Sequence, residues 1–149
     1  MRNDSRLPRV LHALLHLGEM TTPATSGLIA QMLGTNPSVV RRTMAGLRDA
    51  GILVSVKGHG GGWSLAKPLN EITLLEIYAA LGSPTLFAIG NDDEQVTCML
   101  ARAASEATDS ALKSAQQHFE RQIMAVSVAD LARNWNPSMA RCDDNIHQT

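Results

Sequence analysis

A glycine-rich segment in the middle of the chain, residues 57–68, limits the possible folds most strongly. It holds four glycines and follows the β-branched run of residues 52–56. The run predicts a strand, the glycines predict a turn, and the residues after them predict a returning strand. Glycine allows positive φ and close approach of the main chain, while Lys57, His59 and Lys67 offer cationic or hydrogen-bonding groups to phosphates. We therefore expect a β-hairpin whose tip lies along nucleic acid.

Two helices joined by a tight turn are expected before this hairpin. Thr25 or Ser26 can cap the first, which would bury Leu28 and Ile29 and end at Gly34. The turn that follows is short enough to hold the two helices against each other.

The second helix of this pair has strong boundary signals and a basic face. Asn36 is a good N-cap, Pro37 suits the first helical position, and Gly51 ends the helix after Ala50. The residues expected to face the core are Val40, Met44 and Leu47. The outer face would then carry Ser38, Arg41, Ala45 and Arg48, with Arg42 beside them. Such a helix-turn-helix places its second helix in the major groove of DNA.

Helix-turn-helix and hairpin together predict a winged helix. We expect Arg41 to reach a base edge, because it shares a face with Ser38 near the helix start, and Lys57 to contact phosphate. The alternative for these arginines is a solvated cationic surface. The residues expected to contact double-stranded DNA are Thr35, Asn36, Ser38, Val39, Arg41, Arg42, Arg48, Lys57, His59 and Gly60.

The charge distribution agrees with this interpretation. Residues 1–68 hold 8 Lys and Arg against 3 Asp and Glu, a net charge of +5, whereas residues 69–149 hold 5 against 11, a net charge of −6. A basic half joined to an acidic half is typical of a nucleic-acid-binding unit attached to a part that does not touch phosphate.

The first helix, expected over residues 6–20, carries His12 and His16 one turn apart. That spacing can bind a metal ion from one face, but no third ligand is evident. The pair could also line a pocket near helices through which two copies of the chain would form a dimer, or it could lie at the edge of the core. We expect no bound metal.

A further helix follows the hairpin. Thr73 and Glu76 form a capping box, and Ile72 can pack on Ile77 as a hydrophobic staple, so this helix is expected over residues 74–81. Ser127 begins one more short helix with a capping pattern.

The stretch from Cys98 to Met124 contains neither Gly nor Pro. A stripe of mostly small apolar residues recurs along it at helical period: Leu100, Ala104, Ala107, Ala111, Ala115, Phe119 and Ile123. A helix this long exceeds what a small domain needs for its own core. We interpret it as a dimerisation helix; the alternative is a helix folded back on its own domain.

These features resemble the bacterial winged-helix regulators of the Rrf type, the IscR, NsrR and CymR family, over the chain up to about residue 133. The matching segments are Arg41-Arg42, residues 47–53, residues 60–68 and residues 72–78. The resemblance implies a homodimer joined through the long helix, recognition helices in successive major grooves, and wings reaching toward the flanking minor groove.

The chain departs from the cluster-binding members of that family. They hold an iron-sulfur cluster with three closely spaced cysteines before the long helix, where this chain has only Cys98. Cys142 lies in the expected tail and does not complete the set. The chain therefore resembles the clusterless branch, and no cofactor is expected. Cys98 is either a redox sensor, with its thiolate stabilised by the helix dipole, or an inert small hydrophobe.

An enzymatic function is not expected. His59 and the following three glycines match the oxyanion-hole motif of some esterases, but the chain has no Gly-x-Ser-x-Gly nucleophile elbow. The chain also lacks a long apolar run and a signal-peptide pattern, so we expect a cytoplasmic protein without membrane contact.

The sequence thus predicts a mainly α fold with a small β-hairpin wing and a long C-terminal dimerisation helix. Residues 1–82 would form the winged helix-turn-helix domain, residues 83–133 the dimerisation region, and residues 134–149 a polar tail. The expected function is that of a homodimeric, sequence-specific DNA-binding transcriptional regulator and repressor, with a small molecule or redox change as effector. The alternative is a winged-helix protein-protein assembly module with little DNA specificity.

Overall fold

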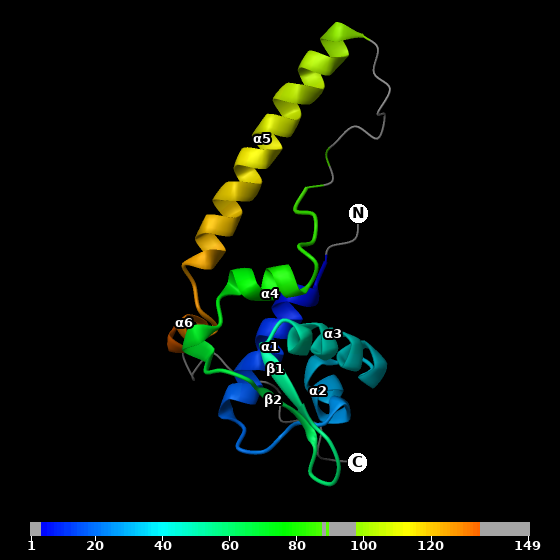
Figure 1. Ribbon diagram of the computed structural model, residues 1–149, viewed down its shortest axis with the longest axis vertical. Helices are drawn as coiled ribbons and strands as arrows, with labels where there is room; N and C mark the ends of the chain where they lie inside the picture. The colour runs from blue at the N-terminus through cyan, green and yellow to red at the C-terminus, as the bar shows by residue number, and fades with distance from the viewer. Residues whose placement is uncertain (1–3, 88, 90–97, 135–149) are drawn as a thin grey trace.

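The computed structural model describes residues 4–87, 89 and 98–134 (Figure 1). The expected polar tail and Cys142 lie outside these residues. The elements, in chain order, are α1 (Arg6–Glu19), α2 (Ser26–Leu33), α3 (Pro37–Asp49), β1 (Leu53–Val56), β2 (Gly62–Leu65), the 3-10 turn η1 (Leu69–Glu71), α4 (Leu74–Ala80), α5 (Met99–Met124) and α6 (Val128–Arg133). Over the described residues the fold is mainly α with one small antiparallel hairpin, as predicted.

The boundaries of α2 and α3 come from the capping residues that the sequence predicts. The Thr25 hydroxyl accepts a hydrogen bond from the Leu28 N–H at 3.1 Å. Gly34 follows α2 in the left-handed region with φ 59°, a conformation that glycine adopts without steric cost. Asn36 Oδ1 then accepts the Ser38 N–H at 2.7 Å, and Pro37 begins α3. A tight turn therefore joins the two helices.

The core is built on the inner faces of α1, α2, α3 and the hairpin. Leu14, Met44, Leu47 and Ile52 are among its fully buried side chains. The prediction that Leu28 faces inward is wrong: this side chain is 37% exposed, because the buried side of α2 is formed by Ile29 and Ala30.

The helix α4 begins with the predicted capping box. Thr73 Oγ1 accepts the Glu76 N–H at 3.2 Å, and a Glu76 carboxylate oxygen accepts the Thr73 N–H at 2.9 Å. Ile72 and Ile77, the expected hydrophobic staple, are both fully buried. The start of α4 is thus held by polar bonds and by apolar burial.

The last helix, α6, packs back onto the N-terminal part of the chain. It contacts α1 and η1, and Val128 is fully buried in the same core as Ile72. Two backbone hydrogen bonds join the segment just before α6 to the start of α4. The Leu74 N–H donates to the Val126 carbonyl at 3.0 Å, and the Val128 N–H donates to the Ile72 carbonyl at 2.9 Å. The C-terminal end of α5 is therefore anchored to the body of the fold.

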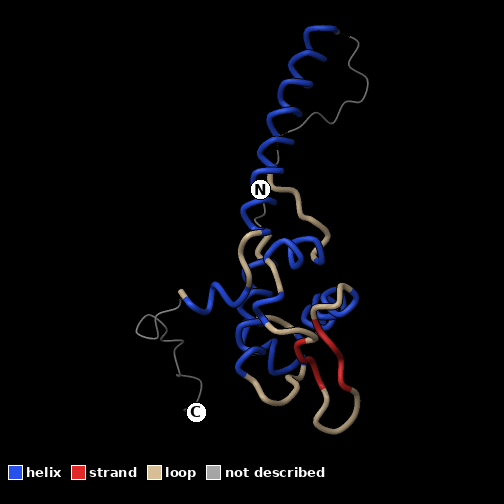
Figure 2. Tube along the Cα trace, turned by 60° about the vertical axis from the view of Figure 1, so that its left-hand side comes forward, coloured by secondary structure: helices blue, strands red, loops and turns tan. Residues whose placement is uncertain are grey.

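The helix α5 extends from this body as a long arm (Figure 1). Its lower end packs on α4, where the rings of Tyr78 and Phe119 meet edge to face at 5.3 Å and Gln116 donates to the Tyr78 hydroxyl at 3.2 Å. None of its residues is buried. The hairpin tip and the free end of α5 lie at opposite ends of the molecule (Figures 1 and 2). None of the described helices combines the length and hydropathy needed for a membrane span.

Candidate nucleic-acid interface

The outer face of α3 is exposed and basic. Val40, Met44 and Leu47 point into the core, as predicted, so the opposite side of the helix faces solvent. Of the predicted DNA contacts, Thr35 is half-buried and the others are exposed: Asn36, Ser38, Val39, Arg41, Arg42, Arg48, Lys57, His59 and Gly60. Helix and wing thus both leave their polar groups open to a partner.

The polar groups on α3 differ in how free they are. Asn36 uses its side-chain oxygen as the helix cap. An Arg41 Nη donates to the Ser38 hydroxyl at 3.2 Å, which holds the guanidinium near the start of the helix. Arg48 pairs with Asp49 at 3.1 Å, so part of its charge is neutralised on its own helix. Arg41 is therefore better placed than Arg48 to donate to a base.

The wing is anchored at its returning strand by Trp63. The antiparallel register pairs Leu53 with Leu65 and Ser55 with Trp63. Trp63 is only 8% exposed, and its indole N–H donates to the Ser26 hydroxyl at 2.9 Å. Trp63 is therefore a packing residue of the hairpin.

A backbone bridge fixes the same strand to the segment between α1 and α2. Trp63 N–H donates to the Ala24 carbonyl at 2.8 Å, and Ala24 N–H donates to the Trp63 carbonyl at 2.9 Å. Gly62 permits this contact, because a Cβ there would lie 2.4 Å from the Ala24 carbonyl oxygen. The wing therefore leaves the core at a fixed angle.

The turn of the wing also requires a glycine. A Cβ at Gly61 would lie 2.3 Å from the Val56 carbonyl oxygen, and the Gly61 N–H donates to the Gly58 carbonyl at 3.0 Å. The N–H group of Gly61, which belongs to the oxyanion-like segment, is thus used within the fold, and so is that of Trp63, the next residue after the segment. Lys57 and His59 lie exposed on this turn.

Lys67 forms an ion pair within the fold. Its ammonium lies 2.5 Å from a carboxylate oxygen of Glu76 on α4. The hydrogen bond from Lys67, followed by that from the Thr73 backbone, lowers the pKa of Glu76. Lys67 therefore joins the base of the wing to α4.

Two cations beside α3 are missing from the predicted interface. Arg6 and Arg9, on the first turns of α1, line a hollow together with Val39 and Thr43 of α3. Arg6 and Arg9 add to the positive charge of the N-terminal half, but their spacing in the sequence matches no binding motif. Only packing of α1 beside α3 reveals their position.

The histidine pair on α1 forms a direct contact. The Nε2 atoms of His12 and His16 lie 2.9 Å apart, and both rings are half-buried. Burial, and then the charge of His16, lowers the pKa of His12. Within the described residues, no group of three or more His, Cys, Asp and Glu side chains is arranged to hold a metal ion. The contact fits the interpretation of the pair as residues at the edge of the core.

Cys98 is the N-cap residue of α5 and is exposed. Backbone hydrogen bonds from Ala101 and then Leu100 lower the pKa of its thiol. A thiolate at this position is stabilised by the helix start, which keeps the redox interpretation open.

Comparison with known proteins places this architecture in one family. Residues 3–134 match the family described as "Rrf2: Iron-dependent Transcriptional regulator". YwnA of Bacillus subtilis (strain 168), which carries the name of an HTH-type transcriptional regulator, is 34% identical over 129 residues, 86% of this chain and 95% of YwnA. YffB of Lactococcus lactis subsp. lactis (strain IL1403), named likewise, is 30% identical and covers 93% of this chain and 91% of its own length.

Solved structures show the same fold. A crystal structure described as that of a DNA-binding protein has a TM-score of 0.70 at 30% identity and covers 86% of this chain and 99% of its own. T. potens IscR has a TM-score of 0.67 at 19% identity and covers 94% of this chain and 92% of its own. The chain belongs to the Rrf2 family of transcriptional regulators.

Proposed function

We propose that the chain is a homodimeric, sequence-specific DNA-binding regulator that represses its targets without an iron-sulfur cluster. The outer face of α3 carries the proposal. Among the described residues, no carboxylate forms a salt bridge with Arg41, Arg42 or Lys57, so these cations are available to an anionic partner. Since β1 contacts α3 and leads into the wing, helix and wing can engage one stretch of duplex. Occupation of an operator blocks other proteins from it, which makes repression the simplest outcome.

The test begins by selecting bound sequences from a random DNA pool with the full chain. Arg41→Ala should then weaken binding to the selected site by about 1–3 kcal/mol and relax preference at one base pair. Lys57→Ala should weaken selected and random DNA alike, because a phosphate contact carries no sequence information. Equal losses for both variants on both DNAs would contradict this assignment of roles.

A winged helix used for protein-protein assembly would give a different result. The hairpin leaves Val54 and Val56 exposed, which such a partner could cover. That function predicts weak DNA binding with no enriched sequence. The proposed regulator should instead give a defined footprint and an affinity that falls steeply with salt.

The homodimer proposal rests on α5. Met99 and Leu100 are 84% and 83% exposed. An open hollow of about 550 Å³ runs along the small residues of the helix, lined by Phe87, Ile89, Ala107, Thr108, Ala111, Leu112 and Ala115. A second copy of α5 would bury this surface, and small side chains allow two helices to approach closely. In this proposal residues 1–82 contact DNA and residues 83–133 form the dimer region, with α6 holding the base of α5.

Ala111→Glu tests the dimer, because it places a charge in the middle of the stripe. The expected result is a shift toward monomer in sedimentation velocity and a loss of cooperative operator binding. Gln117→Glu, which lies on α5 but outside the stripe, is the matched control and should stay dimeric. A dimer that withstands Ala111→Glu would place the interface elsewhere.

The residues present do not fit the iron-sulfur cluster found in other members. Cys98 is the one cysteine among the described residues, and Cys142 is distant in sequence. One thiolate cannot supply the set of cysteine ligands that such clusters take. We therefore propose that the signal reaches this protein by another route, a small molecule or oxidation of Cys98.

A further inference from the structure

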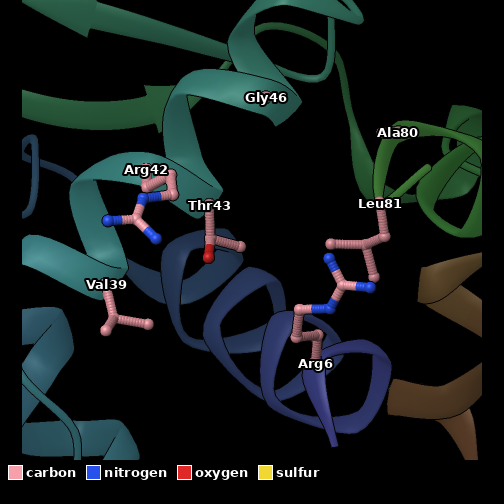
Figure 3. Close-up of a pocket in the computed structure, with 7 residues that line it drawn as sticks. All are labelled: Arg6, Val39, Arg42, Thr43, Gly46, Ala80 and Leu81. Carbon is pink, nitrogen blue, oxygen red and sulfur yellow. The ribbon is translucent and has the colours of Figure 1, made fainter. Parts of the chain in front are cut away.

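A solvent-open hollow of about 230 Å³ lies at the edge of α3, where that helix meets α1 and the end of α4. Two arginines line it, Arg6 from α1 and Arg42 from α3, and Thr43 lies between them (Figure 3). Of the described residues, no Asp or Glu lines the hollow. Guanidinium and hydroxyl donors around an open space suit an anion with several acceptor oxygens.

The cationic surface continues toward the turn between α2 and α3. A neighbouring hollow shares Arg6, Val39 and Thr43 with the first and adds Arg9 and Thr35. Positive groups from α1 therefore border the N-terminal half of α3. A duplex lying on α3 would pass directly over this edge.

In the free protein a carboxylate already holds Arg6. The Asp4 oxygens accept hydrogen bonds from Arg6 Nε at 3.0 Å each, from an Arg6 Nη at 2.6 Å and from the Arg6 backbone N–H at 2.9 Å. The hydrogen bonds from Arg6 lower the pKa of Asp4, so the carboxylate is charged at neutral pH. A carboxylate and a phosphate present the same pair of acceptor oxygens to a guanidinium fork. Asp4 thus occupies the donors that a phosphate would use.

We propose that the hollow between α1 and α3 seats a DNA backbone phosphate on Arg6 and Arg42, and that Asp4 competes for Arg6 until DNA displaces it. This inference rests on the DNA binding proposed above and extends it to the N-terminus of α1. Asp4 acts as a built-in substitute for the phosphate and lowers affinity for all sequences. Its pair with Arg6 is solvent-exposed, with side-chain exposures of 33% and 51%, so the exchange is easy.

A backbone phosphate suits the hollow better than a free phosphate compound does. Small-molecule sites bury most of their ligand in an enclosed cleft, whereas this hollow is open and its cations are exposed. Three of its wall residues, Val39, Arg42 and Thr43, belong to the helix that faces the duplex. A ligand seated here would therefore lie at the edge of the DNA surface.

The experiment compares Asp4→Asn and Arg6→Gln with wild-type protein on selected and random duplexes over a range of salt concentrations. Asp4→Asn should bind both DNAs about twofold to fivefold more tightly, the size expected when an exposed ion pair no longer competes. Arg6→Gln should weaken both and reduce the slope of log affinity against log salt by about 0.9. In the Arg6→Gln background, Asp4→Asn should gain less, because the competition acts through Arg6. Glu19→Gln, at the other end of α1, removes the same charge away from the hollow and should change affinity little.

Equal effects of Asp4→Asn and Glu19→Gln, or an unchanged salt slope in Arg6→Gln, would overturn the inference while leaving DNA binding intact. Titration of the DNA-free protein with inorganic phosphate distinguishes the other source of this ligand. Saturable binding that Arg6→Gln abolishes and that competes with DNA would assign the hollow to a free phosphate compound. Wild-type protein that retains no duplex from the pool would contradict the proposed function itself.

Discussion

The backbone bridge between Ala24 and Trp63, which holds the wing against the core, can be tested with the substitution Gly62→Ala. A Cβ at this position would lie 2.4 Å from the Ala24 carbonyl oxygen and 2.6 Å from its carbon, and both belong to backbone that cannot rotate away. The residue also has φ 150°, which an L side chain rarely adopts. The substitution therefore forces the Ala24–Trp63 bridge apart.

The expected cost follows from what is lost. Two backbone hydrogen bonds, of 2.8 and 2.9 Å, would break, each worth about 0.5–1.5 kcal/mol. The strained φ adds about 1–3 kcal/mol. Gly62→Ala should therefore lower the free energy of unfolding by about 2–6 kcal/mol, a large part of the stability of a small domain.

Urea unfolding followed by circular dichroism measures this cost. Gly60→Ala is the matched control, because Gly60 has φ 71° and no atom within 4 Å of its Cβ position. It should lose only about 1–2 kcal/mol, the cost of a left-handed residue. A Gly62→Ala protein as stable as the Gly60→Ala protein would refute the steric argument. A folded variant that keeps wild-type DNA affinity would show that the wing does not need this anchor.

Three further predictions concern titration and redox chemistry. The pKa of His12 is lowered in the folded protein, so the unfolded chain takes up this proton first and stability should fall as pH drops below about 6.5. His12→Gln should reduce this loss, measured as the urea midpoint between pH 7.5 and 5. His59→Gln, at an exposed position, is the control and should not reduce it. The pKa of Glu76 is also lowered in the folded protein, so its charged form stabilises the fold. Because the Lys67–Glu76 pair is partly exposed, Glu76→Gln should lower the free energy of unfolding by only about 0.5–1 kcal/mol at pH 7. This difference from wild type should disappear as pH falls from about 4.5 through the pKa of Glu76 in the folded protein. If Cys98 senses oxidants, peroxide should weaken operator binding by wild-type protein and not by Cys98→Ser; full affinity after peroxide treatment, without an intersubunit disulfide, would exclude that role.

Short-range signals in the sequence were enough to locate the helices and the hairpin. Gly34, Asn36 and the Thr73–Glu76 capping box act on neighbours within four residues, so their spacing alone predicts where α2, α3 and α4 begin or end. The helical spacing of apolar residues likewise predicted which side of α3 is buried and how long α5 is. The same pattern failed for Leu28, because a short apolar helix leaves its buried side ambiguous.

The candidate interface was predicted in part. The exposed cations of α3 and the wing turn follow from period and from the glycine run, whereas Arg6 becomes a candidate only when α1 lies beside α3. Lys67, a cation near the glycines, pairs with Glu76 on α4, and no local signal in the sequence predicts this partner. The sequence shows which side chains are charged, but which group each of them contacts depends on the fold.

The elements, their caps and the basic character of the N-terminal half can be predicted from the sequence alone, because these features depend on residues close together in the chain. Packing of the whole chain is needed to bridge Trp63 to Ala24, to return Val128 to the core beside Ile72, and to bring Arg6 to the edge of α3. Each of these outcomes depends on several apolar faces being buried at once. Which packing is most stable therefore depends on the whole chain, and no hydrophobic period within a single segment predicts it.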